Sequence, residues 1–261
     1  MLRILLAGDS TVTEQARDND DPGLNYCGWG QMIGRFFDDT QIFNYAVSGY
    51  TTHDFREKGQ YDKLKDELRT GDYVLVQFGH NDQKRPELRA DEGYFEALDL
   101  YIKEIRAFGG SPVFVTPVAR NTWHEGGVEY WDLLADYANA MKNVARKNDI
   151  PLIDLHGASV EWIISLGQKG AKRYFYPGDF THPNEYGGFK WAELIAGLVK
   201  NSEHAGFSGL REKLKPTETW EALDIEESNA DPETGWLFPP NEETDYKEAL
   251  KDVIAFATQR K

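Results

Sequence analysis

The sequence predicts an α/β fold built on a parallel, doubly wound sheet. Five short β-rich runs alternate with longer stretches in which apolar residues recur at helical spacing. Several of the runs are almost continuously apolar, as expected for strands that are covered on both faces. The chain has 261 residues, of which 40% are hydrophobic, so it can bury a proper core in one large domain or in a domain with an appendage.

The predicted strands are short and rich in β-branched and aromatic residues. In chain order they span residues 3–7, 41–47, 73–78, 111–117 and 150–155. The predicted helices span residues 29–38, 54–69, 92–108, 129–148, 156–169 and 184–200. This alternation favours parallel strands, because each helix returns the chain to the same end of the sheet.

The composition of the sequence changes near residue 203, where the chain becomes acidic and contains several prolines. We therefore divide the chain into a main domain, residues 1–202, and an acidic C-terminal extension, residues 203–261. The aromatic residues Trp220, Trp236 and Phe238 predict that this extension packs on the core or on a partner subunit, which would make the protein a homodimer. A short helix over residues 246–259 is expected at its end.

The charge and the cysteine content exclude several classes of protein. A net charge of −15 and a pI near 4.8 argue against nucleic acid and anionic membranes as partners, because both require a basic surface. Cys27 is the only cysteine, which excludes an intrachain disulfide and a cysteine-cluster metal site. The first apolar run is too short for a signal-peptide core or a membrane span. The expected compartment is the cytoplasm.

Polar motifs follow the predicted strands at the point where each strand ends. In a sheet of this kind, ligands bind beyond the carboxyl ends of the strands. The segments at these positions are "GDST" (8–11), "SGYTT" (48–52), "GHNDQ" (79–83) and "VARNTW" (118–123). We therefore expect the functional site to be built from these four loops.

Ser10 can act as a nucleophile only if a base removes its proton and donors stabilise the oxyanion. Of the six histidines, His182 is the best base, because Asp179 stands three residues before it and can hold its Nδ1–H. Pro183 fits the first position of the next helix. Asn81 and Gly49 can supply oxyanion donors. Each of these residues, taken alone, also fits a structural role in a cap or a turn.

Together the four motifs resemble the SGNH, or GDSL-type, hydrolases over residues 2–200, and their context is most similar to the rhamnogalacturonan acetylesterases. The resemblance implies a flavodoxin-like three-layer sandwich with a five-stranded parallel sheet between helices. It implies a triad of Ser10, Asp179 and His182, with Ser10 N–H, Gly49 N–H and Asn81 as the oxyanion hole. The implied reaction is hydrolysis of acetyl esters on pectic oligosaccharides, with no metal and no cofactor.

Candidates for holding the sugar are the aromatic and bidentate side chains near these loops, Trp29, Tyr50, Arg120 and Trp123. Trp29 equally fits a core position, and Arg120 equally fits an internal ion pair. Three other functions stay open. They are a general short-chain carboxylesterase or acyl-thioesterase on the same triad, a carbohydrate-binding protein without turnover, and a metal-dependent phosphoesterase using His80, Asp82, Asp179 and His182.

Overall fold

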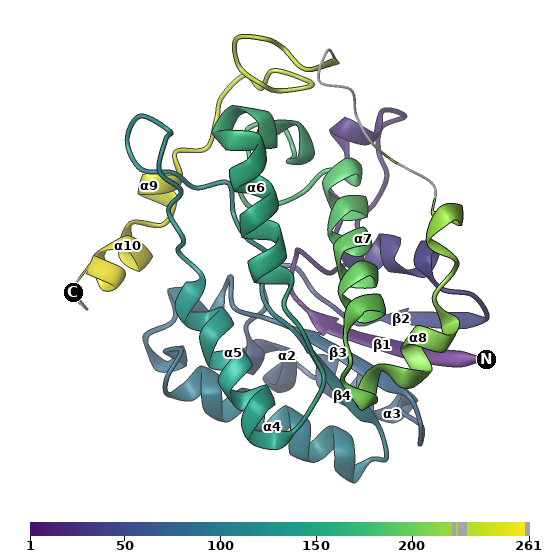
Figure 1. Ribbon diagram of the computed structural model, residues 1–261. Helices are drawn as coiled ribbons and strands as arrows, with labels where there is room; N and C mark the ends of the chain where they lie inside the picture. The colour runs from purple at the N-terminus through teal and green to yellow at the C-terminus, as the bar shows by residue number, and fades with distance from the viewer. Residues whose placement is uncertain (221–222, 224–228, 259–261) are drawn as a thin grey trace.

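The computed structural model describes residues 1–220, 223 and 229–258, and its centre is a five-stranded, fully parallel sheet (Figure 1). The strand order is β2-β1-β3-β4-β5, which is the flavodoxin-like order. The strands are β1 (Leu2–Gly8), β2 (Thr40–Asn44), β3 (Tyr73–Gln77), β4 (Ser111–Val115) and β5 (Leu152–Ile153). The predicted fold class is therefore confirmed.

Helices cover both faces of the sheet and form the outer layers (Figure 1). One face carries α1 (Trp29–Met32), α6 (Leu155–Ala171), α7 (Glu185–Asn201) and α8 (Ser208–Lys213). The other face carries α2 (Thr52–Glu57), α3 (Gln60–Glu67), α4 (Gly93–Ala107) and α5 (Ala135–Asn148). The short helices α9 (Tyr246–Ala249) and α10 (Lys251–Thr258) belong to the extension. Single turns of 3₁₀ helix lie at Pro22–Leu24, Ile33–Phe36, Asp82–Lys84, Pro86–Leu88, Lys172–Tyr174, Ala205–Phe207 and Thr217–Thr219.

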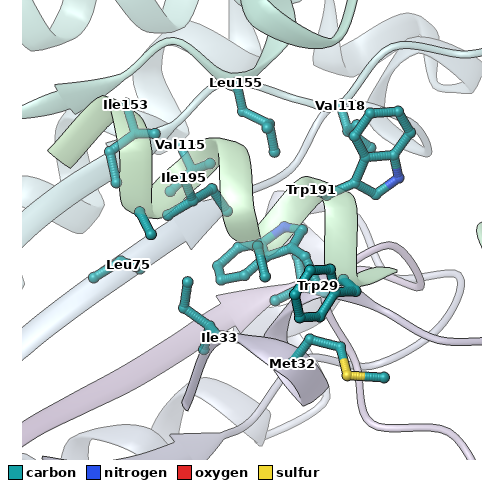
Figure 2. Close-up of a cluster of buried hydrophobic side chains, with 14 of the residues drawn as sticks. Trp29, Met32, Ile33, Leu75, Val115, Val118, Ile153, Leu155, Trp191 and Ile195 are labelled. Atoms are coloured by element: carbon teal, nitrogen blue, oxygen red, sulfur yellow. The ribbon is translucent and has the colours of Figure 1, made fainter. Parts of the chain in front are cut away.

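The sheet divides the apolar core into two clusters, because successive side chains of a strand point to opposite faces. In β1, Ile4 and Leu6 belong to the cluster beneath α1 and α7, whereas Leu5 and Ala7 belong to the opposite one. Figure 2 shows the first cluster, in which Trp29 lies among the buried side chains. Each large apolar side chain buried in this way contributes about 1.5–3 kcal/mol.

The boundaries of several elements differ from the prediction for local reasons. The helix predicted over 54–69 is broken at Gly59, whose φ of 77° is left-handed, so α2 and α3 are separate. The helix predicted over 129–148 begins only at Ala135, because Trp131 N donates to Thr122 O and holds the preceding segment against the loop after β4. The helix predicted over 29–38 passes into a 3₁₀ turn after Met32.

The C-terminal extension lies against the rest of the chain. Phe207, Leu210 and Trp236 are buried in the first apolar cluster, and the Trp220 ring packs edge-on against Phe36 with centroids 5.0 Å apart. Phe238 lies against Gly23. The helix predicted over 246–259 is divided into α9 and α10, and its last residue falls outside the described residues. The homodimer stays a prediction.

Across the described part of the chain, every helix is too short or too polar to cross a membrane.

Candidate active site

The motifs that follow the strands meet at the carboxyl edge of the sheet. Ser10 comes two residues after β1, Asn81 follows β3, and Asp179 and His182 lie in the loop that precedes α7. Ser10 and His182 are 172 positions apart in sequence, yet their side chains are within hydrogen-bonding distance. The fold therefore brings together the two ends of the predicted main domain, residues 1–202.

Ser10, His182 and Asp179 form a continuous relay. Ser10 Oγ lies 2.9 Å from His182 Nε2, and His182 Nδ1 lies 2.8 Å from Asp179 Oδ2. Because the ionised carboxylate only accepts, the neutral imidazole carries its proton on Nδ1 and leaves Nε2 free to accept from the serine hydroxyl. This is the geometry that a general base requires.

The loop around Asp179 is fixed by its own hydrogen bonds. Asp179 Oδ1 accepts from the backbone N–H groups of Thr181, at 2.7 Å, and of His182, at 3.0 Å. Burial works to raise the pKa of Asp179, but the hydrogen bonds from His182 and from these two backbone groups hold it below its ordinary value. Pro183 does not take the first position of α7 as predicted, because the helix begins at Glu185, after Asn184 caps it by accepting from Gly187 N.

The turn that carries Ser10 rests on a buried chain of polar groups. Asp9 Oδ1 accepts from Thr11 N and Thr11 Oγ1, and Thr11 Oγ1 accepts from Gln77 Nε2 at 2.5 Å. Gln77 Oε1 in turn accepts from Trp29 Nε1 at 2.9 Å. Trp29 is 0% exposed, so the prediction that it contacts the sugar is wrong. The Trp29 indole thus fixes Gln77, and Gln77 in turn holds Thr11 in the turn that carries Ser10.

The two predicted oxyanion donors line the same hollow as the nucleophile. Gly49 has a φ of 81°, and no atom lies within 4 Å of the position that a Cβ would occupy, so its backbone is open to a ligand. Asn81 Nδ2 donates one hydrogen bond to Tyr50 O at 3.1 Å, which leaves its second hydrogen for the substrate. We call this cavity of about 420 Å³ the Gly49 hollow; it is lined by Ser10, Gln15, Tyr26, Ser48, Gly49, Asn81, Lys84, Asp179 and His182.

Asp82 positions these donors, a role that the sequence did not reveal. Its carboxyl group accepts from Thr52 N and Thr52 Oγ1, at 2.9 and 2.6 Å, and from Gly79 N at 3.1 Å. Burial raises the pKa of Asp82 to about 7, although the hydrogen bonds from Thr52 favour the ionised form. These bonds join the loop after β3 to the start of α2, and thereby hold Asn81 near Gly49. In the sequence, only the "GHND" motif drew attention to Asp82.

A family model described as GDSL-like lipase/acylhydrolase matches residues 6–188. The chain belongs to this family. It is 34% identical to the rhamnogalacturonan acetylesterase RhgT of Bacillus subtilis over 210 residues, which cover 75% of this chain and 88% of RhgT. It is 26% identical to the rhamnogalacturonan acetylesterase of Emericella nidulans over 70% of this chain and 79% of that protein.

Solved structures agree with this membership. The crystal structure of YxiM from Bacillus subtilis superposes with a TM-score of 0.70 at 27% identity, over 78% of this chain and 58% of YxiM. The acetylxylan esterase Axe2 of Geobacillus stearothermophilus, at 17% identity, shares the fold with a TM-score of 0.56 over 79% of this chain and 94% of Axe2. The family match and the identity to RhgT show that this GDSL-like protein is a carboxylic ester hydrolase.

Two of the other predicted sugar contacts are not at the GDSL-like site. Trp123 is 3% exposed, and its indole donates to Asn121 Oδ1 at 2.6 Å and packs edge-on against Tyr130, so this prediction is wrong. The half-buried Tyr50 ring packs against the second apolar cluster beneath Lys58 and lines neither hollow beside Ser10. Tyr50 contributes its carbonyl oxygen, which holds Asn81.

Arg120 does lie at the site of this GDSL-like enzyme, in a second hollow on the other side of Ser10. This hollow, which we call the Arg120 hollow, has a volume of about 190 Å³. Thr244, Ala249 and Leu250 of the C-terminal extension form one of its walls. Its other lining residues are Ser10, His80, Asn81, Lys84, Arg120 and residues 179–182. The alternative role of Arg120, an internal ion pair, is not seen among the described residues, where its hydrogen-bond partners are Thr181 Oγ1 and His80 O.

The four side chains considered for a metal site have separate partners. His80 Nε2 lies 2.9 Å from Val118 O, and His80 Nδ1 lies 3.3 Å from Asp9 Oδ2. Asp82 binds Thr52 and Gly79, while Asp179 and His182 bind each other. Within the described ranges, no three His, Cys, Asp or Glu side chains are grouped so that they could hold a metal ion.

Proposed function

We propose that this protein is a serine esterase that removes acetyl groups from pectic, rhamnogalacturonan-type oligosaccharides. The observation that carries the proposal is the relay from Ser10 Oγ to His182 Nε2 and from His182 Nδ1 to Asp179 Oδ2, at 2.9 and 2.8 Å. The sugar follows from similarity to RhgT and to the enzyme of Emericella nidulans, both of which are named rhamnogalacturonan acetylesterases.

The reaction proceeds in two acyl transfers. Ser10 Oγ attacks the ester carbonyl while His182 Nε2 takes its proton, and the imidazolium then protonates the departing sugar hydroxyl. Water attacks the acetyl-enzyme in the same way and releases acetate. The N–H groups of Ser10 and Gly49 and the Asn81 amide stabilise the oxyanion in both steps. No step requires a metal or a cofactor.

The polarity of the Gly49 hollow supports a carbohydrate ligand over a long acyl chain. Its lining includes the side chains of Gln15, Ser48, Asn81 and Lys84, which suit hydroxyl groups rather than methylenes. Tyr26, which stacks on Tyr176 with ring centroids 3.8 Å apart, offers an aromatic surface for a sugar ring. A general carboxylesterase or acyl-thioesterase would need an apolar channel at this point.

Acetate release tests the proposal most directly. The wild-type protein is incubated with acetylated rhamnogalacturonan oligosaccharides and with acetylated xylo-oligosaccharides, and kcat/KM is measured for each. We expect the pectic substrate to be preferred. The Ser10→Ala variant should lose at least about 10⁴-fold in kcat, whereas Ser165→Ala, on the outer face of α6, should keep wild-type activity.

Three results would contradict the proposal. Full activity of Ser10→Ala would eliminate the serine mechanism. A preference for xylo-oligosaccharides would eliminate the pectic substrate, and faster hydrolysis of octanoyl than of acetyl esters would favour the general carboxylesterase.

The cytoplasm remains our predicted compartment, for which the single cysteine is the supporting observation.

A further inference from the structure

Residues 242–246 of the C-terminal extension lie against the loop that precedes α7, and we call them the extension clamp. Thr244 N donates to Gly178 O at 2.8 Å. Gly178 has a φ of 83°, and a Cβ at this position would lie only 2.6 Å from Glu242 O. The backbone of the clamp therefore passes so close to the loop that only a glycine fits there.

Tyr246 attaches the clamp at a second point. Its ring packs against the Phe180 ring with centroids 5.5 Å apart. Its hydroxyl group accepts from Trp123 N at 3.3 Å and donates to Trp123 O. The helix α9, which begins at Tyr246, thus lies beside the loop that follows β4 (Figure 1). One side chain of the extension joins this loop to the loop that precedes α7.

The two points of attachment stand on either side of Asp179, because Gly178 and Phe180 are its neighbours in the chain. The loop between them is closed by its own hydrogen bonds. Asp179 N donates to Tyr176 O at 2.9 Å, and Tyr176 N donates to His182 O at 3.0 Å. A shift of the loop therefore moves the carboxylate that lies 2.8 Å from the His182 imidazole. A displacement of about 1 Å is enough to break a hydrogen bond of this length.

We infer that the extension clamp positions the relay: Tyr246 and Thr244 hold Asp179 where its carboxylate orients the His182 imidazole. The inference rests on the proposed function, in which this imidazole is the base. The clamp lies outside residues 6–188, the part of the chain that matches the family. The positioning is therefore supplied by the extension and adds Tyr246 and Thr244 to the residues on which the reaction depends.

Steady-state hydrolysis of 4-nitrophenyl acetate tests the inference, because this small ester reports acyl transfer without a sugar. Tyr246→Ala removes the contacts with Phe180 and Trp123. It should lower kcat about tenfold or more, since a small misplacement of an orienting group has effects of this size. KM should stay within about twofold, because Tyr246 lines neither hollow beside Ser10. Tyr246→Phe keeps the ring against Phe180 and should give an intermediate kcat.

Proton NMR follows the relay itself. The Nδ1–H proton of His182 faces a carboxylate, so its resonance is expected far downfield, and its absence in His182→Ala assigns it. The resonance should be present in the wild type. It should broaden in Tyr246→Ala, because a loosened relay lets this proton exchange with water.

Two control variants separate positioning from stability. Lys247→Ala changes the exposed neighbour of Tyr246 on α9 and should keep the wild-type kcat. Leu210→Ala removes a buried side chain on α8, near the start of the extension. It should lower the free energy of unfolding, yet the folded protein should keep both the kcat and the downfield resonance.

A wild-type kcat in Tyr246→Ala overturns the inference, as does an equal loss of kcat in Leu210→Ala. A raised KM with unchanged kcat also overturns it, because the clamp would then act on the substrate. Should Tyr246→Ala fail to fold, Tyr246→Phe decides, and a wild-type kcat with an unchanged resonance in that variant removes the clamp.

Failure of the proposed function gives a different result. Activity that survives in Ser10→Ala removes the serine mechanism itself. An inactive Ser10→Ala together with fully active Tyr246 variants leaves that mechanism intact and removes only the clamp.

Discussion

Asn81 donates through Nδ2 to the carbonyl oxygen of Tyr50, while its Oδ1 lies 3.4 Å from the Lys84 ammonium. The amide is therefore already oriented before substrate arrives. An oriented donor costs no reorganisation when negative charge develops on the ester oxygen, which is why such donors contribute strongly to the rate.

Replacement of Asn81 by alanine should therefore lower kcat by about 10²–10³-fold, with little change in the free energy of unfolding. Steady-state kinetics on an acetyl ester and urea unfolding measure the two effects. Asn139→Ala, an exposed change on α5, is the control and should affect neither. Wild-type kcat in Asn81→Ala would remove Asn81 from the oxyanion hole.

The carboxylate of Asp179 predicts a pH dependence of stability. An unfolded aspartate has a pKa of about 3.9, and that of Asp179 is lower in the folded protein. The ionised form therefore stabilises the fold above about pH 4, and this contribution is lost as the pH falls through the folded pKa.

The stability advantage of the wild type over Asp179→Asn should accordingly be present at pH 7 and pH 5 and shrink at pH 3. Urea unfolding at these three values checks the trend, with Asp66→Asn, an exposed change on α3, as the control. An advantage that stays constant down to pH 3 would show that the carboxylate charge is not its source.

We predicted Ser10, Asp179 and His182 as partners from the sequence, because a serine nucleophile needs a base and the histidine base needs an acid that orients it. It failed for Trp29 and Trp123, because an aromatic residue near these loops is equally suited to a sugar and to the core. The direction of the indole depends on how the following segment packs. The hydrogen bonds of Arg120 to Thr181 and His80 could not be foreseen either, since they depend on segments that meet only in the folded chain.

At the scale of elements, α1, β3 and the nucleophile turn are joined through the Trp29 indole and Gln77. Trp29→Phe keeps most of the apolar ring but removes the donor to Gln77 Oε1, which is left unsatisfied in a dry environment. The variant should lose about 1–3 kcal/mol of unfolding free energy for this reason, and kcat should fall because the Ser10 turn loses its support.

Trp191→Phe is a matched control, because Trp191 is equally buried in the same cluster and its Nε1 has no hydrogen-bond partner in the described part of the chain. Urea unfolding of both variants isolates the hydrogen bond from the loss of ring area. Equal destabilisation of the two variants would mean that the Trp29–Gln77 bond adds nothing.

The elements themselves were well predicted where periodicity is strong, as in α4 and α7. They were poorly predicted where a single residue, or a contact with a distant segment, decides where a helix begins or ends. Gly59 ends α2 through its left-handed backbone, and the segment before Ala135 is held by Thr122 instead of continuing as a helix. Hydrophobic periodicity reveals neither the left-handed backbone of Gly59 nor the hydrogen bond that holds the segment before Ala135.

At the scale of the whole molecule, the composition of the sequence changes at residue 203, but the apolar core does not end there. Phe207 and Leu210, which follow this point, are buried. The end of the extension is attached to the loop that bears His182. Thr244 N donates to Gly178 O at 2.8 Å, and the Tyr246 ring packs against Phe180 with centroids 5.5 Å apart. Linear sequence gives no sign of these contacts.

This attachment has a consequence during biosynthesis. The ribosome makes Ser10 long before Leu250, so the two walls of one small cavity are synthesised far apart in time. A nascent chain can assemble its sheet first, but it cannot complete the Arg120 hollow until Leu250 has left the exit tunnel. The Arg120 hollow is therefore completed only after Ser10, Asp179 and His182 have been made.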